Sequence, residues 1–247
     1  MIAPTILAIE TCTAAGSVAV LFSPDQTNEK VLANNEWMRS RSHAEVATPA
    51  IEDAVKIAGG WEKIDVLAVG VGPGSFTGIR VGLNAARTIA WSTHRALVPI
   101  RSTDALIEAA RSAGVATRGD VIVAVLNAQM GLYFAAWESS PTAVTDPAAF
   151  DVVSLGEKLK ALKKPITLLG ESADVVAPEL QALGLVVHRV NATHLDFPHA
   201  LSVARLAARL IQHNAKSLDP SSLVRMFTWQ ATQPLYIRAS GAEEKMG

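Results

Sequence analysis

The sequence predicts an α/β protein with a mixed sheet in each of two halves, and three observations indicate this class. Strand and helix patterns alternate along the whole chain. An apolar hairpin pattern occurs near the start and again near the middle, as expected of an internal duplication. With 49% hydrophobic residues over 247 positions, the chain can bury a core in one large domain or in two small ones.

The first half opens with the first hairpin. Residues 6–10 form an apolar run that ends at a turn-rich stretch, and residues 17–22 return as the second strand. The elements expected after it are a helix at 43–58, a buried strand at 64–71, a helix at about 77–91 and a short strand at 96–100. We place the domain boundary near residues 102–104, so the expected lobes are 1–103 and 104–247.

The second half repeats the opening hairpin. The elements expected there are strands at 121–126 and 132–137 joined by a turn at 127–131, then a helix at 155–162, a strand at 166–169, a helix at 173–183, a strand at 186–190 and a helix at 201–213. Residues 239–247 are polar and have no apolar period, so we expect this end to be mobile.

Charge and cysteine content argue against several classes of function. The 22 Lys and Arg and 23 Asp and Glu give a net charge of −1, which disfavours a protein that holds nucleic acid or an anionic membrane through its overall field. The longest charge-free stretch, 121–137, is shorter than the ~20 apolar residues of a membrane-spanning helix. Cys12 is the one cysteine, which excludes an intrachain disulfide and a cysteine-based metal site. We recognise no targeting segment and expect a cytoplasmic protein without membrane contact.

A glycine-rich loop, GPGSFTG at 72–78, leads from the buried strand into the next helix. Backbone amides at a helix N-terminus suit an anion. The candidate anion-binding residues are Gly72, Gly74, Ser75 and Thr77. The common motifs do not fit, because a P-loop needs Lys where Ile79 stands, the dinucleotide fingerprint needs Gly or Ala at Thr77, and a serine-hydrolase elbow needs Ser at Phe76. The alternative is structural: Ser75 or Thr77 caps the helix and the glycines permit a tight turn.

Extended to residue 82, this loop resembles the signature of one protein family. GPGSFTGIRVG at 72–82 is similar to the glycine loop of the TsaB (YeaZ) family, bacterial proteins needed to make threonylcarbamoyladenosine beside the tRNA anticodon. Further segments that resemble this family are LAIET at 7–11, His43 at the start of the first helix, NAQMG at 127–131 and PLYIR at 234–238. Together these motifs cover nearly the whole chain, and their order at this length is specific.

The resemblance implies a fold, a function and partners. The implied fold is the two-lobed actin-like, Hsp70-like and sugar-kinase (ASKHA) fold, which explains the repeated hairpin. The implied function is that of a scaffold and activator for a TsaD-like transferase, with a TsaE-like ATPase in the larger assembly. The resemblance also implies a homodimer when the chain is alone, and contact with tRNA only through the complex.

The same resemblance implies a non-catalytic paralogue. Catalytic relatives such as TsaD hold a metal through a His-x-x-x-His pair, and Ser102 and Leu106 stand at those positions here. Leucine cannot ligate a metal, and serine is a poor replacement for imidazole. Asn127 and Gln129 lack charges that the family often has, and Glu10 replaces a shorter Asp. We therefore expect no catalytic residue, no metal and no cofactor; the alternative is an ATP-dependent phosphotransferase or a peptidase of the same superfamily.

The histidines offer weaker candidates. His194 and His199 are the one close pair, but Pro198 breaks the helix that would align their side chains on a metal. We expect His43 to be a helix-start or interface residue, since no oriented third group accompanies it as in a nucleophile–base pair.

The helices at 43–58 and 77–91 have wider apolar faces than one sheet requires. At about 100° per residue their apolar positions cover roughly 180° and 200°, against about 100° for packing on one side. The small residues at 78, 82, 86 and 90, spaced by four, would also let another helix approach closely. The predicted interface with TsaD or a second copy comprises Ala47, Ile51, Val55, Ile79, Leu83, Ala86 and Ala90. The alternative is that the two helices bury their surplus against each other.

Overall fold

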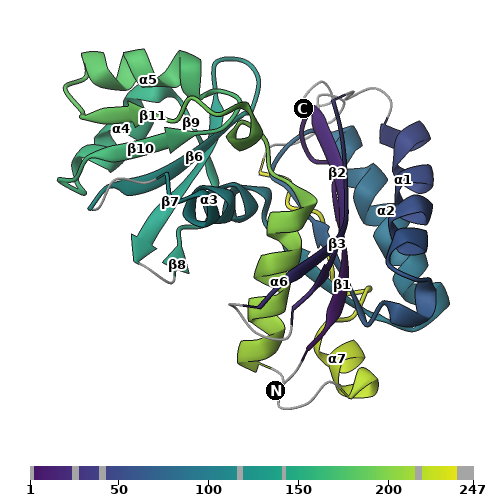
Figure 1. Ribbon diagram of the computed structural model, residues 1–247. Helices are drawn as coiled ribbons and strands as arrows, with labels where there is room; N and C mark the ends of the chain where they lie inside the picture. Colours follow the sequence, from purple (N-terminus) through teal and green to yellow (C-terminus); the bar gives the residue numbers. More distant parts are fainter. Residues whose placement is uncertain are drawn as a thin grey trace. The chain divides into compact units, whose positions relative to one another are not determined.

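The computed structural model describes residues 3–23, 28–38, 43–115, 119–140, 143–214 and 219–237 (Figure 1). The chain forms two compact units. Unit 1 comprises Met1–Ala105 and His199–Leu235, and unit 2 comprises Leu106–Pro198 and Tyr236–Gly247. Each unit has a mixed sheet with helices on both faces, which confirms the predicted α/β class and the duplication.

The sheet of unit 1 is built around its first strand. Its strands are β1 (Thr5–Glu10), β2 (Ala15–Phe22), β3 (Lys30–Met38), β4 (Val66–Gly70) and β5 (Ala96–Ile100), in the spatial order β3-β2-β1-β4-β5. β1 and β2 form the predicted antiparallel hairpin, and β4 and β5 continue the sheet in parallel with β1. β3 was not expected, because Asn34 and Asn35 interrupt the apolar alternation of this strand.

Helices cover both faces of this sheet. α1 (His43–Ile57) and α2 (Phe76–Thr93) lie on one face, and α6 (Ala200–Asn214) lies on the other (Figure 1). Successive β1 side chains point to opposite faces, so Leu7 packs in the cluster under α1 and α2 whereas Ile6 packs in the cluster under α6. All six residues of the strand are therefore buried, and residues 6–9 are apolar, as expected of a strand covered on both faces.

The predicted second lobe, 104–247, differs from the structure. α6 and α7 (Pro220–Met226) follow unit 2 along the chain but belong to unit 1. The Ala200 amide at the start of α6 donates to Ser17 Oγ on β2 at 2.8 Å, and Leu223 of α7 joins the same core cluster. The physical reason is that the second face of the first sheet needs a cover, and the chain returns to supply it.

Unit 2 repeats this plan. Its strands are β6 (Val121–Asn127), β7 (Tyr133–Ser140), β8 (Ala143–Val144), β9 (Ala148–Phe150), β10 (Ile166–Leu169) and β11 (Val187–Arg189), ordered β11-β10-β6-β7-β8 with β9 paired to β7. α4 (Val152–Lys160) and α5 (Ala173–Ala182) cover one face, and α3 (Ser102–Ala113) supplies apolar side chains to the other. α3 was not predicted from the sequence; Leu106, Ile107 and Ala110, all fully buried, form its core-facing side.

Two further expectations concern the chain end and membranes. The end at 239–247, and the last residue of the PLYIR motif, lie outside the described residues. Within the described parts of the chain, no helix has both the length and the apolar character needed to cross a bilayer.

Candidate functional site

The glycine-rich loop packs against the turn that follows β1. The Ser75 amide donates to the Cys12 carbonyl at 2.6 Å. A Cβ on Gly74 would lie 2.0 Å from that carbonyl oxygen, and a Cβ on Gly78 would lie 2.1 Å from the Thr11 carbonyl oxygen. Both distances are shorter than any real Cβ contact, so these two positions hold glycine because two backbone segments approach each other closely there.

The four anion candidates have different structural roles. Ser75 is the N-cap of α2, where its Oγ accepts from the Gly78 amide at 3.3 Å, so the capping alternative is confirmed for this residue. Gly72 is buried with φ +100°, and Thr77 is exposed. Packing and capping thus account for most of the loop, and an anion site at Gly72, Gly74, Ser75 and Thr77 stays a prediction.

A buried carboxyl group lies beneath this loop. Glu10, the last residue of β1, is fully buried; its Oε1 accepts from the Cys12 amide at 2.7 Å and its Oε2 accepts from Ser102 Oγ at 2.9 Å. A Cβ on Gly70 would lie 2.0 Å from Glu10 Oε2, so the missing side chain on β4 makes room for the carboxyl. Cys12 Sγ donates to the Gly70 carbonyl at 3.3 Å.

Burial governs the protonation of this cluster. Desolvation raises the pKa of Glu10, opposed by the hydrogen bonds from Cys12 and Ser102. Desolvation and the neighbouring Glu10 charge raise the pKa of the Cys12 thiol well above its ordinary value. The thiol is therefore protonated and enclosed, which argues against a nucleophilic cysteine.

Replacing Glu10 by Gln is expected to make stability less dependent on pH. Because the folded-state pKa of Glu10 is raised, its stabilising contribution is complete below the ordinary carboxyl range and is lost as pH rises through the folded pKa. The wild-type protein should therefore lose stability between pH 4.5 and pH 8, whereas E10Q should not. The difference in free energy of unfolding, E10Q minus wild type, should rise across this range, as measured by urea denaturation. A difference between the two proteins that is constant with pH would contradict this assignment.

Ser102 and Leu106 both lie on α3 and are fully buried. The Ser102 hydroxyl is bonded to Glu10, and Leu106 belongs to the apolar core of unit 2. Neither side chain presents a free donor to a metal. In the described portion of the chain, no three His, Cys, Asp or Glu side chains are grouped so that they could hold a metal ion.

His194 and His199 are not brought together on one unit. His194 lies in η3 (Thr193–Leu195) of unit 2, whereas His199 begins the returning segment of unit 1. Asp196, between them, accepts from Arg189 Nη2 at 2.6 Å, and His199 Nδ1 lies 3.4 Å from Glu36 Oε1. Asp196 is thus paired with Arg189, and His199 lies close to a carboxylate of β3.

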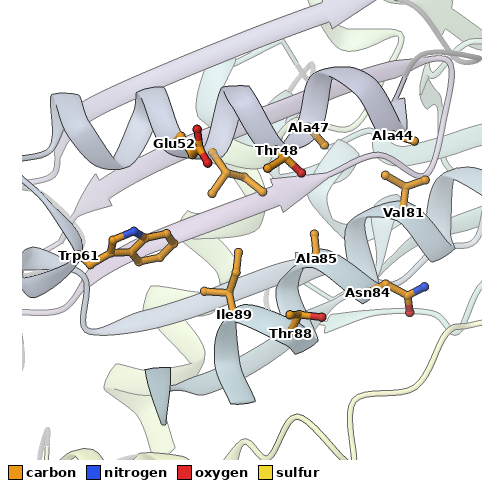
Figure 2. A pocket seen from close by; sticks show the side chains of 11 residues that line it. Ala44, Ala47, Thr48, Glu52, Trp61, Val81, Asn84, Ala85, Thr88 and Ile89 are labelled. Carbon is orange, nitrogen blue, oxygen red and sulfur yellow. The ribbon is translucent and has the colours of Figure 1, made fainter. Parts of the chain in front are cut away.

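α1 and α2 border a groove of about 500 Å³ on the surface of unit 1. Figure 2 shows Ala44 and Val81 at one end and Trp61 and Ile89 at the other. The groove is lined mostly by apolar side chains: Ala44, Ala47, Thr48, Ile51, Glu52, Trp61, Val81, Asn84, Ala85, Thr88 and Ile89. An apolar hollow on a surface is typical of a protein–protein or a ligand-binding site.

Hydrogen bonds hold both ends of this groove. Trp61 opens η2 (Trp61–Lys63), and Arg95 donates to the carbonyls of Trp61 and Ile64, each at 2.7 Å. At the start of α1, His43 Nδ1 accepts from Trp37 Nε1 at 2.9 Å, since an indole can only donate. His43 Nε2 therefore carries the proton and donates to the Thr13 carbonyl at 2.8 Å. His43 is thus the helix-start residue that the sequence indicated.

The predicted interface residues require correction. Each is no more than 3% exposed in this chain, and their exposed fractions are Ala47 1%, Ile51 3%, Val55 3%, Ile79 1%, Leu83 2%, Ala86 0% and Ala90 1%. Ala47 and Ile51 line the groove floor. The other five face the protein's own interior, because the centre of each apolar arc packs on the sheet and on the neighbouring helix.

The small residues at 78, 82, 86 and 90 on α2 were expected to allow close packing of another helix. At Gly78 and Gly82 a different segment approaches. A Cβ on Gly78 would meet the Thr11 carbonyl, and a Cβ on Gly82 would lie 2.4 Å from Thr11 Oγ1, so the close approach is made by the residue that follows β1. The groove is bordered instead by a second stripe spaced by four, Val81, Ala85 and Ile89. Val81, Ala85 and Ile89 lie at the edge of the apolar arc of α2, next to polar Asn84 and Thr88. This position at the edge of the arc is the sequence signal that could have identified them.

Comparisons with known proteins agree on a family. The family model described as TsaD, tRNA N6-adenosine threonylcarbamoyltransferase, matches residues 31–246. The chain is 36% identical over 132 residues to the tRNA threonylcarbamoyladenosine biosynthesis protein TsaB of Haemophilus influenzae, covering 53% of this chain and 52% of that protein. It is 28% identical over 162 residues to TsaB of Escherichia coli K12, covering 65% and 62%. The match to the first of these relatives thus spans about half of its length.

A solved structure supports the fold. The chain superimposes with a TM-score of 0.70 and 20% identity on YeaZ from Pseudomonas aeruginosa, covering 94% of this chain and 99% of that one. A second structure from the same organism, described as similar to the peptidase YeaZ, gives a TM-score of 0.72 at 19% identity and covers 95% and 100%. At these identities the likeness concerns the fold, which is the two-lobed ASKHA type.

Proposed function

The chain belongs to the TsaD family and, within it, to the TsaB (YeaZ) proteins of tRNA threonylcarbamoyladenosine biosynthesis, and from this premise we propose that it is a non-catalytic subunit that binds and activates a TsaD-like transferase. The partner transferase then makes the product of the complex, threonylcarbamoyladenosine. A TsaE-like ATPase joins the larger assembly, tRNA is reached through the complex, and the setting is the cytoplasm.

The groove between α1 and α2 is the observation that carries this proposal. Val81, Ala85 and Ile89 form a ridge spaced by four along α2, which is the pattern into which the side chains of another helix interdigitate. Trp61 supplies a large apolar surface at one end, and aromatic residues of this kind often anchor protein interfaces. We assign the transferase to this groove, and a second copy of the chain to the same groove when the transferase is absent.

The buried cluster supports a non-catalytic role. Ser102 and Glu10 are hydrogen-bonded as a serine and a carboxylate would be in a hydrolase, but both are fully buried beneath the glycine loop. A peptide or nucleotide has no access to side chains that are enclosed in this way. Leu106, at the second of the positions where catalytic relatives hold a metal, is committed to the core of unit 2.

Depleting the protein from its cells is expected to remove threonylcarbamoyl from tRNA while leaving the threonylcarbamoyl-adenylate donor in place. The reason is that the proposed role supports the transfer step and not the synthesis of the donor. Mass spectrometry of digested tRNA, with the donor measured in the same extracts, tests this. A normal level of the modified adenosine would refute the assignment, and loss of the donor as well would move the role to an earlier step.

A further inference from the structure

The turn that follows α4 gathers lysines on one exposed segment of unit 2. The lysine turn, residues 158–164, holds Lys158, Lys160, Lys163 and Lys164, and all four are exposed. Among the described residues, none of the four takes part in an ion pair. Within the described segments, no carboxylate oxygen thus lies within 4.0 Å of their ammonium groups.

This charge stands out against an acidic background. Residues 106–198 contain seven Lys and Arg against ten Asp and Glu, and four of the seven are the lysines of this turn. Glu157 is the one acidic residue within α4 itself. The near-zero net charge of the chain thus conceals a local cationic patch, which an argument from the overall field cannot detect.

Helix electrostatics explain only part of the cluster. Lys158 and Lys160 lie in the last turn of α4, where cations are favoured by the helix dipole. Lys163 and Lys164 lie beyond the helix, and Lys163 has a φ of +53°, a left-handed conformation that glycine adopts more readily. Glycine adopts this conformation at a cost lower by about 1 kcal/mol.

We propose that the lysine turn binds the phosphate backbone of RNA, and, resting on the function proposed above, that this RNA is the tRNA substrate of the complex. Flexible lysines with unpaired ammonium groups suit phosphates as point charges. They do not suit the centre of a protein interface, where lysine is depleted. Unit 2 then contributes to holding the substrate, whereas the groove of unit 1 holds the partner.

Two variants with the same change in net charge test the site. Lys160, Lys163 and Lys164 are replaced together by Gln, and the matched control replaces the exposed Lys30, Lys56 and Lys63 of unit 1. Each full-length chain is mixed with saturating transferase partner, and its affinity for an unmodified tRNA transcript is measured between 50 and 200 mM salt. We expect the first variant to lose about tenfold or more in affinity at the lowest salt, and to lower the salt slope by about two, since each phosphate contact contributes roughly 0.7–0.9. The control should retain wild-type binding.

A single substitution at Lys163 separates the effect of the ammonium group on tRNA affinity from the effect of the backbone conformation on stability. K163G is expected to raise the free energy of unfolding, since glycine accepts the positive φ, while lowering tRNA affinity. Equal losses in both triple variants would indicate the overall charge, and unchanged affinity in the first triple, or no tRNA binding by any form, would overturn the proposal. Partner binding is measured in the same samples: if the first triple loses the transferase but not tRNA, the patch binds an acidic protein surface. Neither result depends on whether depletion removes the modified adenosine.

Discussion

Ala85→Arg is expected to abolish partner binding in a folded protein, whereas Ala86→Arg is expected to unfold the chain. The two residues are neighbours on α2 and receive the same side chain. Ala86 is fully buried in the core cluster of unit 1, so an arginine there is an unpaired buried charge that costs several kcal/mol. That cost is comparable with the ~5–15 kcal/mol by which a whole domain is stable.

Ala85 lies at the edge of the same arc and lines the groove, half-buried. An arginine at this position can extend along the groove into solvent, so we expect the folding free energy to change by less than about 1 kcal/mol. A partner helix that occupies the groove would meet a desolvated charge, and association should weaken by about a hundredfold or more. Thermal unfolding and calorimetry with the transferase partner measure both quantities on both variants. If A85R binds normally, the groove is not the partner site; if A86R folds, the description of the α2 core is wrong.

Gly78→Ala is expected to destabilise the protein by more than about 2 kcal/mol, opposite in sign to its effect in an ordinary helix. In an exposed helix interior, alanine is preferred to glycine by about 1 kcal/mol. Here the new Cβ would lie 2.1 Å from the Thr11 carbonyl oxygen, and a backbone atom cannot move aside cheaply. Its displacement would pull the turn after β1 away from α2.

Gly156→Ala on α4 is the matched control for this prediction. Its new Cβ would lie 2.7 Å from Leu183 Cδ1, the end of a flexible side chain that can rotate away. Urea denaturation of the two variants should therefore give a large loss for Gly78 and a small change for Gly156. Similar changes at the two sites would mean that the loop can relax, and that the glycine at position 78 serves another purpose.

The pattern of apolar residues predicted most of the secondary structure because most elements here have one plain periodicity. β1 has a continuous apolar run at residues 6–9, and α6 combines a regular apolar stripe with a polar side. β3 and α3 were not predicted from the sequence. Asn34 and Asn35 in β3 interrupt its alternation, whereas Leu106, Ile107 and Ala110 form one buried side of α3.

The width of an apolar helical arc was not sufficient to predict which residues form the interface. The sequence correctly indicates that α1 and α2 are too apolar for one-sided packing, but the width of an arc does not say which of its positions meet the protein's own sheet. Ala86 and Val81 are both small apolar residues on one helix, and only the packing of α2 on the sheet and on α1 decides that Ala86 is enclosed while Val81 borders the groove.

The sequence by itself determined the α/β class, the duplicated hairpin, the family and the glycine loop, because these are properties of neighbouring residues and of local periodicity. Tertiary structure alone decided three other features: the return of α6 to the first sheet, the enclosure of Glu10 with Ser102, and the position of the groove between α1 and α2. Each depends on a contact between residues that are far apart in the chain, such as the 92 positions that separate Glu10 from Ser102. Burial and close approach are set by such contacts, and no local pattern contains them.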